Sequence, residues 1–185
     1  IVEQQKISAW AVLDIAARNK DTALRNAYLK AKRQTQRGAE GSPACYVISS
    51  DQHDALTMQL MIEKLLNQGI EIHVAKEPFL GDGYLYPDGS YIVQLNQPKY
   101  GLITTLLGRT LYPGNSWTRG RDGLPLSPQD TATDTMAEFM GIDADPIDYI
   151  DCENLENVTA PEYPEGSVLG ESEYGYALDC WANEA

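Results

Sequence analysis

Four side chains that could do chemistry lie in one short polar stretch, where Ser49, Ser50, Asp51 and His53 follow the apolar run Tyr46-Val-Ile. A hydroxyl beside an imidazole can form an activated nucleophile, and a helix starting just after them would offer free N–H groups to an anion. Neighbouring positions rarely give triad geometry, and the chain has no GxSxG motif. We interpret the stretch first as helix capping, with Asp51 and Asp54 as the acceptors, and second as a ligand-binding edge.

The sequence predicts no metal site in this chain. Its two histidines, His53 and His73, begin neither an HxxE nor an HExxH motif, and no CxxC occurs. The acidic series after residue 142 lacks the glycine and the final glutamate of an EF-hand loop. One route to a metal remains: if the two histidines end neighbouring strands, they could approach within about 10 Å.

The three cysteines leave the redox compartment open. Cys45 lies inside an apolar run and is expected to be a small buried hydrophobe. Cys152 and Cys180 could pair if the protein is exported; otherwise all three are free thiols.

Residues 44–79 predict a βαβ core. Apolar residues recur at helical spacing between two short β-forming runs, and Gly69 can end the helix (Met58, Met61, Ile62 and Leu65). We expect adjacent, parallel strands near 45–49 and 70–75, with a helix over 53–67 covering one face. The predicted fold class is therefore α/β, with a small parallel or mixed sheet.

Three regions are expected along the chain. Residues 1–41 form an N-terminal helical segment with a break near Asn19, and residues 42–141 form the α/β domain, which includes a third strand near 91–95. The dipeptide Asp88-Gly89 is typical of a hairpin turn before that strand. Residues 142–185 form an acidic, loop-rich C-terminal segment with short edge strands, in which Tyr174 to Ala185 looks like the start of a following domain.

Charge and composition exclude some classes of function. The chain is 43% hydrophobic, which suffices for a core, and it has no run of 18 apolar residues that could span a membrane. Net charge is −13, although residues 1–41 hold eight of the fourteen Lys and Arg against four acids, giving +4. An acidic chain repels phosphate backbones, so nucleic-acid binding is not expected, and the basic N-terminal segment is interpreted as a solvated helix face.

The N-terminal helices carry more apolar surface than one edge of a small sheet can cover. Trp10, Leu13, Leu24 and Tyr28 are the largest of these side chains. We expect them to form a docking surface, so an isolated chain should either dimerise or leave them exposed. The chain begins at Ile1 with no initiator Met, and we expect it to be a processed piece of a longer protein.

The order of several longer motifs resembles a known arrangement. These are Tyr46-Val-Ile-Ser-Ser-Asp-Gln-His-Asp54, Leu66-Asn-Gln-Gly-Ile-Glu-Ile-His-Val74, Tyr86-Pro-Asp-Gly-Ser-Tyr-Ile-Val-Gln-Leu-Asn-Gln-Pro98, and Leu124-Pro-Leu-Ser-Pro-Gln-Asp130 with Met136 to Gly141. Together they resemble the region downstream of the catalytic domain in large bacterial zinc carboxypeptidase-like proteins, relatives of carboxypeptidase A. The likeness covers roughly residues 10–145.

This resemblance implies an accessory role. In such proteins a peptidase domain precedes a segment like this one, and a glutamine-amidotransferase-like domain often follows. The zinc ligands, the catalytic glutamate and the substrate-binding arginine lie in the peptidase domain, so zinc is expected there and no catalytic residue is carried over to this chain. The parent would cleave C-terminal residues from peptides and, if it follows its family, would be exported to the periplasm or secreted.

Two further hypotheses remain open. The chain could be an α/β module that recognises a small anion or a peptide terminus near Ser49–Asp54. The third hypothesis, an independent hydrolase, has the least support from the residues.

Overall fold

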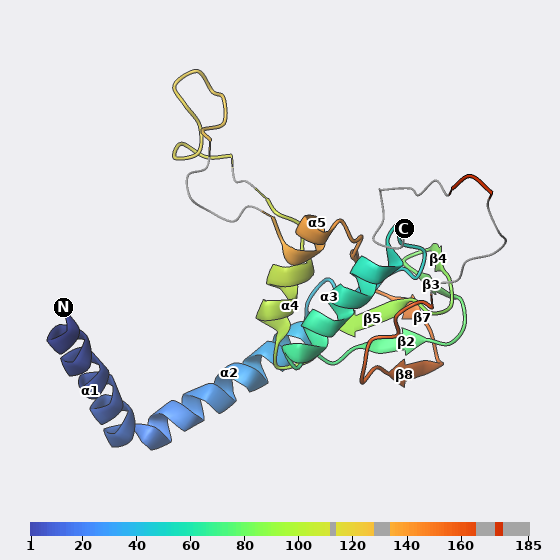
Figure 1. The fold of residues 1–185 in the computed structure, drawn as a ribbon. Coiled ribbons are helices and arrows are strands. Elements are labelled where there is room, and N and C mark those ends of the chain that lie inside the picture. Colours follow the sequence, from blue (N-terminus) through green and yellow to red (C-terminus); the bar gives the residue numbers. More distant parts are fainter. Residues whose placement is uncertain (112–113, 128–133, 166–172, 176–185) are drawn as a thin grey trace.

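The computed structural model describes residues 1–111, 114–127, 134–165 and 173–175. A five-stranded sheet lies at its centre, with helices on one face and a three-stranded sheet on the other (Figure 1). Two apolar clusters lie on opposite faces of the central sheet, and alternate residues of its central strands point into one cluster or the other. Tyr46 and Ile48 pack toward the helices, whereas Cys45 and Val47 pack toward the small sheet.

The central sheet is antiparallel throughout. Its strand order is β6 (Asp145–Ile147), β1 (Cys45–Ile48), β5 (Tyr91–Gln94), β2 (His73–Ala75) and β8 (Leu155–Asn157). Each neighbouring pair is antiparallel. The mixed α/β class is confirmed, but the expected parallel sheet with a βαβ core is wrong, because β1 and β2 are not adjacent and β5 lies between them.

The composition of β5 explains this strand order. Tyr91 and Val93 are buried against the helices, while Ile92 is buried on the opposite face. A strand that is apolar on both faces is best accommodated in the middle of a sheet. In contrast, β2 is three residues long and half-buried at His73 and Val74, so it takes a more peripheral place.

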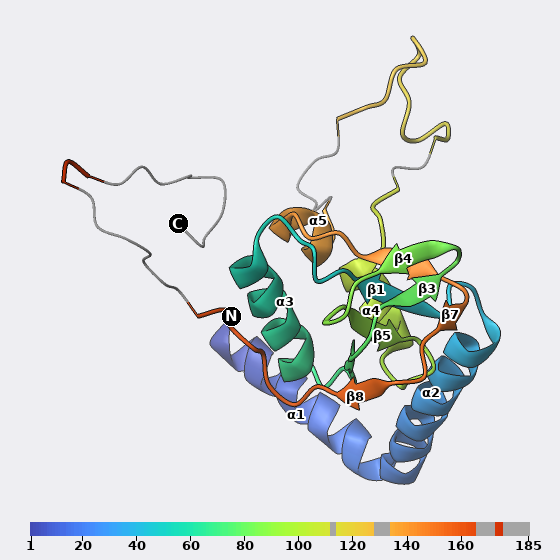
Figure 2. The ribbon, with the colours of Figure 1, turned by 90° about the vertical axis from the view of Figure 1, so that its right-hand side faces the viewer.

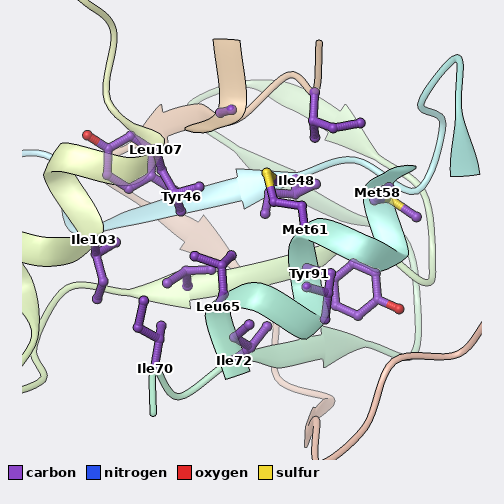
Figure 3. Packing of buried hydrophobic residues seen from close by; sticks show 14 of the residues in the cluster. Tyr46, Ile48, Met58, Met61, Leu65, Ile70, Ile72, Tyr91, Ile103 and Leu107 are labelled. Atoms are coloured by element: carbon purple, nitrogen blue, oxygen red, sulfur yellow. The ribbon is translucent and has the colours of Figure 1, made fainter. Parts of the chain in front are cut away.

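Helix α3 (Ala55–Asn67) confirms the predicted periodicity. Its apolar side forms the principal core with the sheet, as Figure 3 shows for Met58, Met61 and Leu65. The capping residue is Asp54, whose side chain accepts a hydrogen bond from the Thr57 amide at 2.9 Å. Of the two aspartates expected as caps, Asp54 is confirmed in that role, whereas Asp51, three residues earlier, is exposed and does not cap the helix.

The second sheet has the order β4 (Tyr84–Tyr86), β3 (Phe79–Gly81) and β7 (Ile150–Asp151). Its hairpin turns at Asp82-Gly83, and both residues have positive φ, of 46° and 86°. Two consecutive residues of positive φ match the twist of the flanking strands. The hairpin expected at Asp88-Gly89 is wrong, because the strands on either side of that turn belong to different sheets.

Two shorter helices complete the covered face. Helix α4 (Tyr100–Leu107) buries Ile103 and Leu107, and helix α5 (Met136–Met140) begins with a capping box between Thr135 and Glu138. Beyond α5 the chain supplies β6 and β8 to the two edges of the central sheet, and β7 to the small sheet. Strands from the expected C-terminal segment 142–185 thus complete both sheets, while most of Tyr174–Ala185 lies outside the described residues.

The N-terminal helices form an arm that extends from the body of the domain (Figures 1 and 2). Helix α1 (Val2–Arg18) has no buried residue, and it meets α2 (Lys20–Glu40) at Asn19, where the break was predicted. Only the end of α2 is seated: Gly38 is buried against the Leu95 backbone, and Gln34 accepts a hydrogen bond from the Gly101 amide at 3.0 Å. None of the described helices is long and apolar enough to cross a membrane.

Candidate functional site

The polar stretch at the carboxyl end of β1 forms the connection to α3. Ser49 and Ser50 are half-buried, and their polar atoms are engaged locally. The Ser50 amide donates to Ser90 Oγ at 3.1 Å, the Ser50 hydroxyl donates to the Asp88 carbonyl at 2.8 Å, and Ser49 Oγ accepts from the Asp51 amide at 3.2 Å. These bonds join the β1–α3 connection to the turn before β5, which is a structural role.

His53 does not join the serines. Its exposed imidazole lies over Gly141 after α5, where a Cβ built on that glycine would be 3.5 Å from His53 Cε1. The neighbouring Gln52 makes two hydrogen bonds to the backbone of Asp143, at 3.0 and 3.1 Å. In the part of the chain that the structure describes, no hydrogen bond links His53 to Ser49 or Ser50, so the arrangement offers no activated hydroxyl.

The start of α3 is a poor place for an anion. Both carboxylate oxygens of Asp54 are engaged there, one by the Thr57 amide and the other by the Thr57 hydroxyl at 2.7 Å. Because both oxygens accept hydrogen bonds, the Asp54 carboxylate, which is 5% exposed, already occupies the place at the helix start where an anion would bind. The exposed Asp51 adds a second negative charge, and together they disfavour the small-anion form of the binding hypothesis.

The two histidines cannot meet in the way the predicted sheet suggested. Because β5 separates β1 from β2, the strands that would bring His53 and His73 together are not neighbours. His73 faces the small-sheet side beside its cross-strand partner Asn157, and its buried Nδ1 has no hydrogen-bond partner among the described residues. Among the described residues, no group of three or more His, Cys, Asp or Glu is placed to hold a metal ion.

The structure describes two of the three cysteines, Cys45 and Cys152. Cys45 is buried, and burial raises the pKa of its thiol to about 12, with the nearby Asp82 and Asp148 adding to the effect. Cys152 is a free, half-buried thiol, while its proposed partner Cys180 lies outside the described residues.

Two of the aspartates in the acidic series accept hydrogen bonds that hold the C-terminal strands. Asp145 accepts from the Tyr86 hydroxyl at 2.9 Å, and Asp148 accepts from the Ser42 hydroxyl at 3.2 Å.

A groove that the sequence did not reveal lies beside Ser49. Its volume is about 440 Å³, and it runs between β4 and β6 (Ser49, Tyr84, Leu85, Tyr86, Asp145, Pro146 and Ile147). The two strands that line it are some 60 positions apart in the sequence, so no local pattern brings them together. The Gly81-Asp-Gly83 turn indicates where β4 begins, so it could have predicted one of the two strands that line the groove.

The arm leaves many large apolar side chains exposed. Trp10, Leu13, Leu24 and Tyr28 are 65%, 61%, 70% and 64% exposed, which confirms the expectation that they are left uncovered. Leu24 and Tyr28 lie on the same side of α2 as Gly38. The face of α2 that packs on the body therefore extends along the helix beyond the body.

Comparison with known proteins found no matching family model, no significantly similar curated protein and no significantly similar solved structure. Function must therefore be inferred from the residues and the geometry of this chain.

Proposed function

We propose that this chain is a non-catalytic accessory domain of a zinc carboxypeptidase-like protein, and that it packs on the upstream peptidase domain through α1 and α2. The observation that carries the proposal is the exposure of the arm. Nine large apolar side chains there are each at least 61% exposed (Ile1, Val2, Ile7, Trp10, Val12, Leu13, Ile15, Leu24 and Tyr28). The choice of partner comes from the sequence resemblance, which also implies a downstream glutamine-amidotransferase-like domain.

The energetics favour a partner on the same polypeptide. Full burial of one Val, Leu, Ile or Phe side chain contributes about 1.5–3 kcal/mol, so covering half of the nine would contribute roughly 7–14 kcal/mol. Free association costs an estimated 4–15 kcal/mol or more in lost translational and rotational freedom, which offsets most of that gain. A covalent link to the partner domain reduces this cost by raising the effective concentration.

The charge of the arm defines the complementary surface. Residues 1–41 carry a net +4, whereas the rest of the chain carries −17, the difference between −13 and +4. We expect the partner surface to be apolar at its centre and acidic around it, because opposite potentials at the rim steer two surfaces together.

The test compares amide hydrogen exchange of α1 in this chain alone and in the parent protein. A Trp10→Asp, Leu13→Asp variant places two charges in the proposed interface, and a Gln4→Asp, Ser8→Asp variant places two on the opposite side of the same helix. We expect α1 to be protected at least tenfold in the parent, with protection lost in the first variant and kept in the second.

Two outcomes would refute docking on the peptidase domain. One is equal exchange of α1 in the chain alone and in the parent. The other is a dimer of the isolated chain that the first variant dissolves, combined with an unprotected arm in a monomeric parent, because the partner of the arm would then be a second copy.

The non-catalytic part of the proposal has its own test. Zinc titration by calorimetry on the isolated chain, with a peptide ending in Leu or Arg as substrate, should show neither submicromolar binding nor release of the terminal residue. Tight binding that is lost in a His53→Ala, His73→Ala variant, together with metal-dependent cleavage, would overturn it.

A further inference from the structure

We propose that the groove between β4 and β6 binds an extended basic peptide, in which apolar side chains alternate with Lys or Arg and whose backbone lies along β4. This binding site is independent of the arm, since none of its residues belongs to α1 or α2. The two proposals therefore stand or fall separately.

The position of the groove favours an extended ligand. β4 is the outer strand of the small sheet and β6 is the outer strand of the central sheet, so strand edges border the groove on both sides. A peptide can add to such an edge through main-chain hydrogen bonds. Pro146 in β6 has no N–H to donate, whereas β4 has no proline, so β4 is the edge that can pair.

The side chains of β4 supply apolar contacts. Tyr84 and Leu85 are 71% and 72% exposed, on opposite sides of the strand, and Tyr86, on the same side as Tyr84, is buried against Phe79 with ring centroids 5.3 Å apart. Successive side chains of an extended peptide point to opposite sides, so alternate residues would meet this surface. Tyrosine suits such a site because its ring gives contact area at little cost in conformational entropy.

The electrostatics select a cationic ligand. The segments that surround the groove, residues 42–54, 77–98 and 134–165, contain no Lys or Arg. Asp145 lies in the wall, and burial raises the pKa of the Tyr86 hydroxyl, with further contributions from its hydrogen bond to Asp145 and from the negative charges of Asp145 and Asp82. Lys or Arg beside the apolar anchors would meet this negative potential, whereas an acidic peptide would be repelled.

The experiment is fluorescence anisotropy on the whole chain with a labelled eight-residue peptide of alternating Val and Lys. Two control peptides replace every Lys by Glu or every Val by Ser. The test variant is Tyr84→Ala, Leu85→Ser, and the matched control is Leu80→Ser, which removes an exposed leucine from the neighbouring strand of the same sheet but outside the groove.

We expect the Kd for the Val/Lys peptide to rise at least tenfold in the test variant and to change less than twofold in the control. Both control peptides should bind at least tenfold more weakly than the Val/Lys peptide. Equal binding by the test variant, or by the peptide with Ser in place of Val, would refute the proposal, because it would show only general attraction of a cation to an acidic chain.

A second measurement covers the case in which the test variant does not fold. In the unaltered protein, titration with the Val/Lys peptide should shift the amide resonances of Tyr84–Tyr86 more than those of the other β-strands. Shifts confined to other parts of the chain would refute the groove as the site.

Discussion

Replacing Gly38 by alanine tests how the arm is attached to the body. A Cβ at this position would lie 1.7 Å from the Leu95 carbonyl oxygen and 2.8 Å from the Asn96 amide nitrogen. An ordinary contact begins at 3.4 Å, so α2 would have to move by 3.4 − 1.7 = 1.7 Å. Both sides of this clash are backbone, which no rotamer change can relieve.

Two effects of opposite sign determine the outcome. Helix propensity alone predicts that Gly38→Ala stabilises α2 by about 1 kcal/mol. Overpacking of this kind costs about 1–3 kcal/mol.

The cost is limited, because the end of α2 can instead lift away from the body. It would then lose the hydrogen bond from the Gly101 amide to Gln34, worth about 0.5–1.5 kcal/mol. It would also lose the contact of Arg37 with the Tyr100 ring, 5.2 Å from its centroid and worth about 0.5–1 kcal/mol, together with some apolar burial. The expected net result is a loss of about 1–2 kcal/mol in the free energy of unfolding.

Urea unfolding followed by circular dichroism measures this change. The control is Gln36→Ala, which alters an exposed position of the same turn and should change the free energy of unfolding by less than about 0.5 kcal/mol. Amide exchange along α2 should also accelerate in the Gly38→Ala variant. A variant as stable as the natural sequence, or more stable, would refute the proposed seating of α2 on Leu95.

Three further predictions concern other parts of the domain. Asp54→Ala removes the α3 cap and should cost about 1 kcal/mol, lowering the Tm in a thermal melt by roughly 2–5 °C. Hydrogen bonds from the Thr110 hydroxyl and from backbone amides lower the pKa of Glu138 from 4.5 to about 2. Its stabilisation is therefore present above pH 4.5 and lost as the pH falls toward 2, and melts at pH 5 and pH 2 should show the Tm gap to Glu138→Gln closing. Cys45, with its raised pKa, should resist thiol reagents at pH 8 in a Cys152→Ser, Cys180→Ser background until urea unfolds the chain; rapid reaction of the native protein would contradict its burial.

Local elements could be predicted from the sequence because their determinants are close together. The spacing of Met58, Met61 and Leu65 defines the buried side of α3 within three turns. The break at Asn19 and the end of the last short helix at Gly141 follow equally from local residues, and Gly141 adopts the left-handed conformation with φ of 67°. Two local expectations were mistaken: Asp51 does not cap α3, and Asp88-Gly89 does not join two strands of one hairpin.

Strand order could not be predicted in the same way. A crossover helix determines that β1 and β2 run in the same direction, but it leaves room for another strand between them. What places β5 there is the burial of Tyr91, Ile92 and Val93 on both faces, a property of the assembled sheet. The short apolar run 91–95 was visible, and its lack of alternation was the signal that went unused.

In the candidate site, too, local features could be predicted from the sequence and contacts between distant segments could not. The polar stretch from Ser49 to His53 was correctly placed at the end of a strand, and the next residue in this connection, Asp54, caps the helix that follows. The groove beside it was missed because β4 and β6 meet only through the tertiary fold. Exposure of Trp10 was foreseen from composition, since a small sheet has too little edge to cover two long helices.

The last strands that the structure describes lie at the two edges of the central sheet, with β6 beside β1 and β8 beside β2. During synthesis, β1, β2 and β5 leave the ribosome first, and their outer edges stay open until residues 145–157 follow. Unpaired strand edges are templates for pairing with other chains, so the nascent domain is exposed to misassembly throughout that interval. A gene fragment that stops at the end of α5 would lack β6 and β8, so the outer edges of β1 and β2 would stay unpaired.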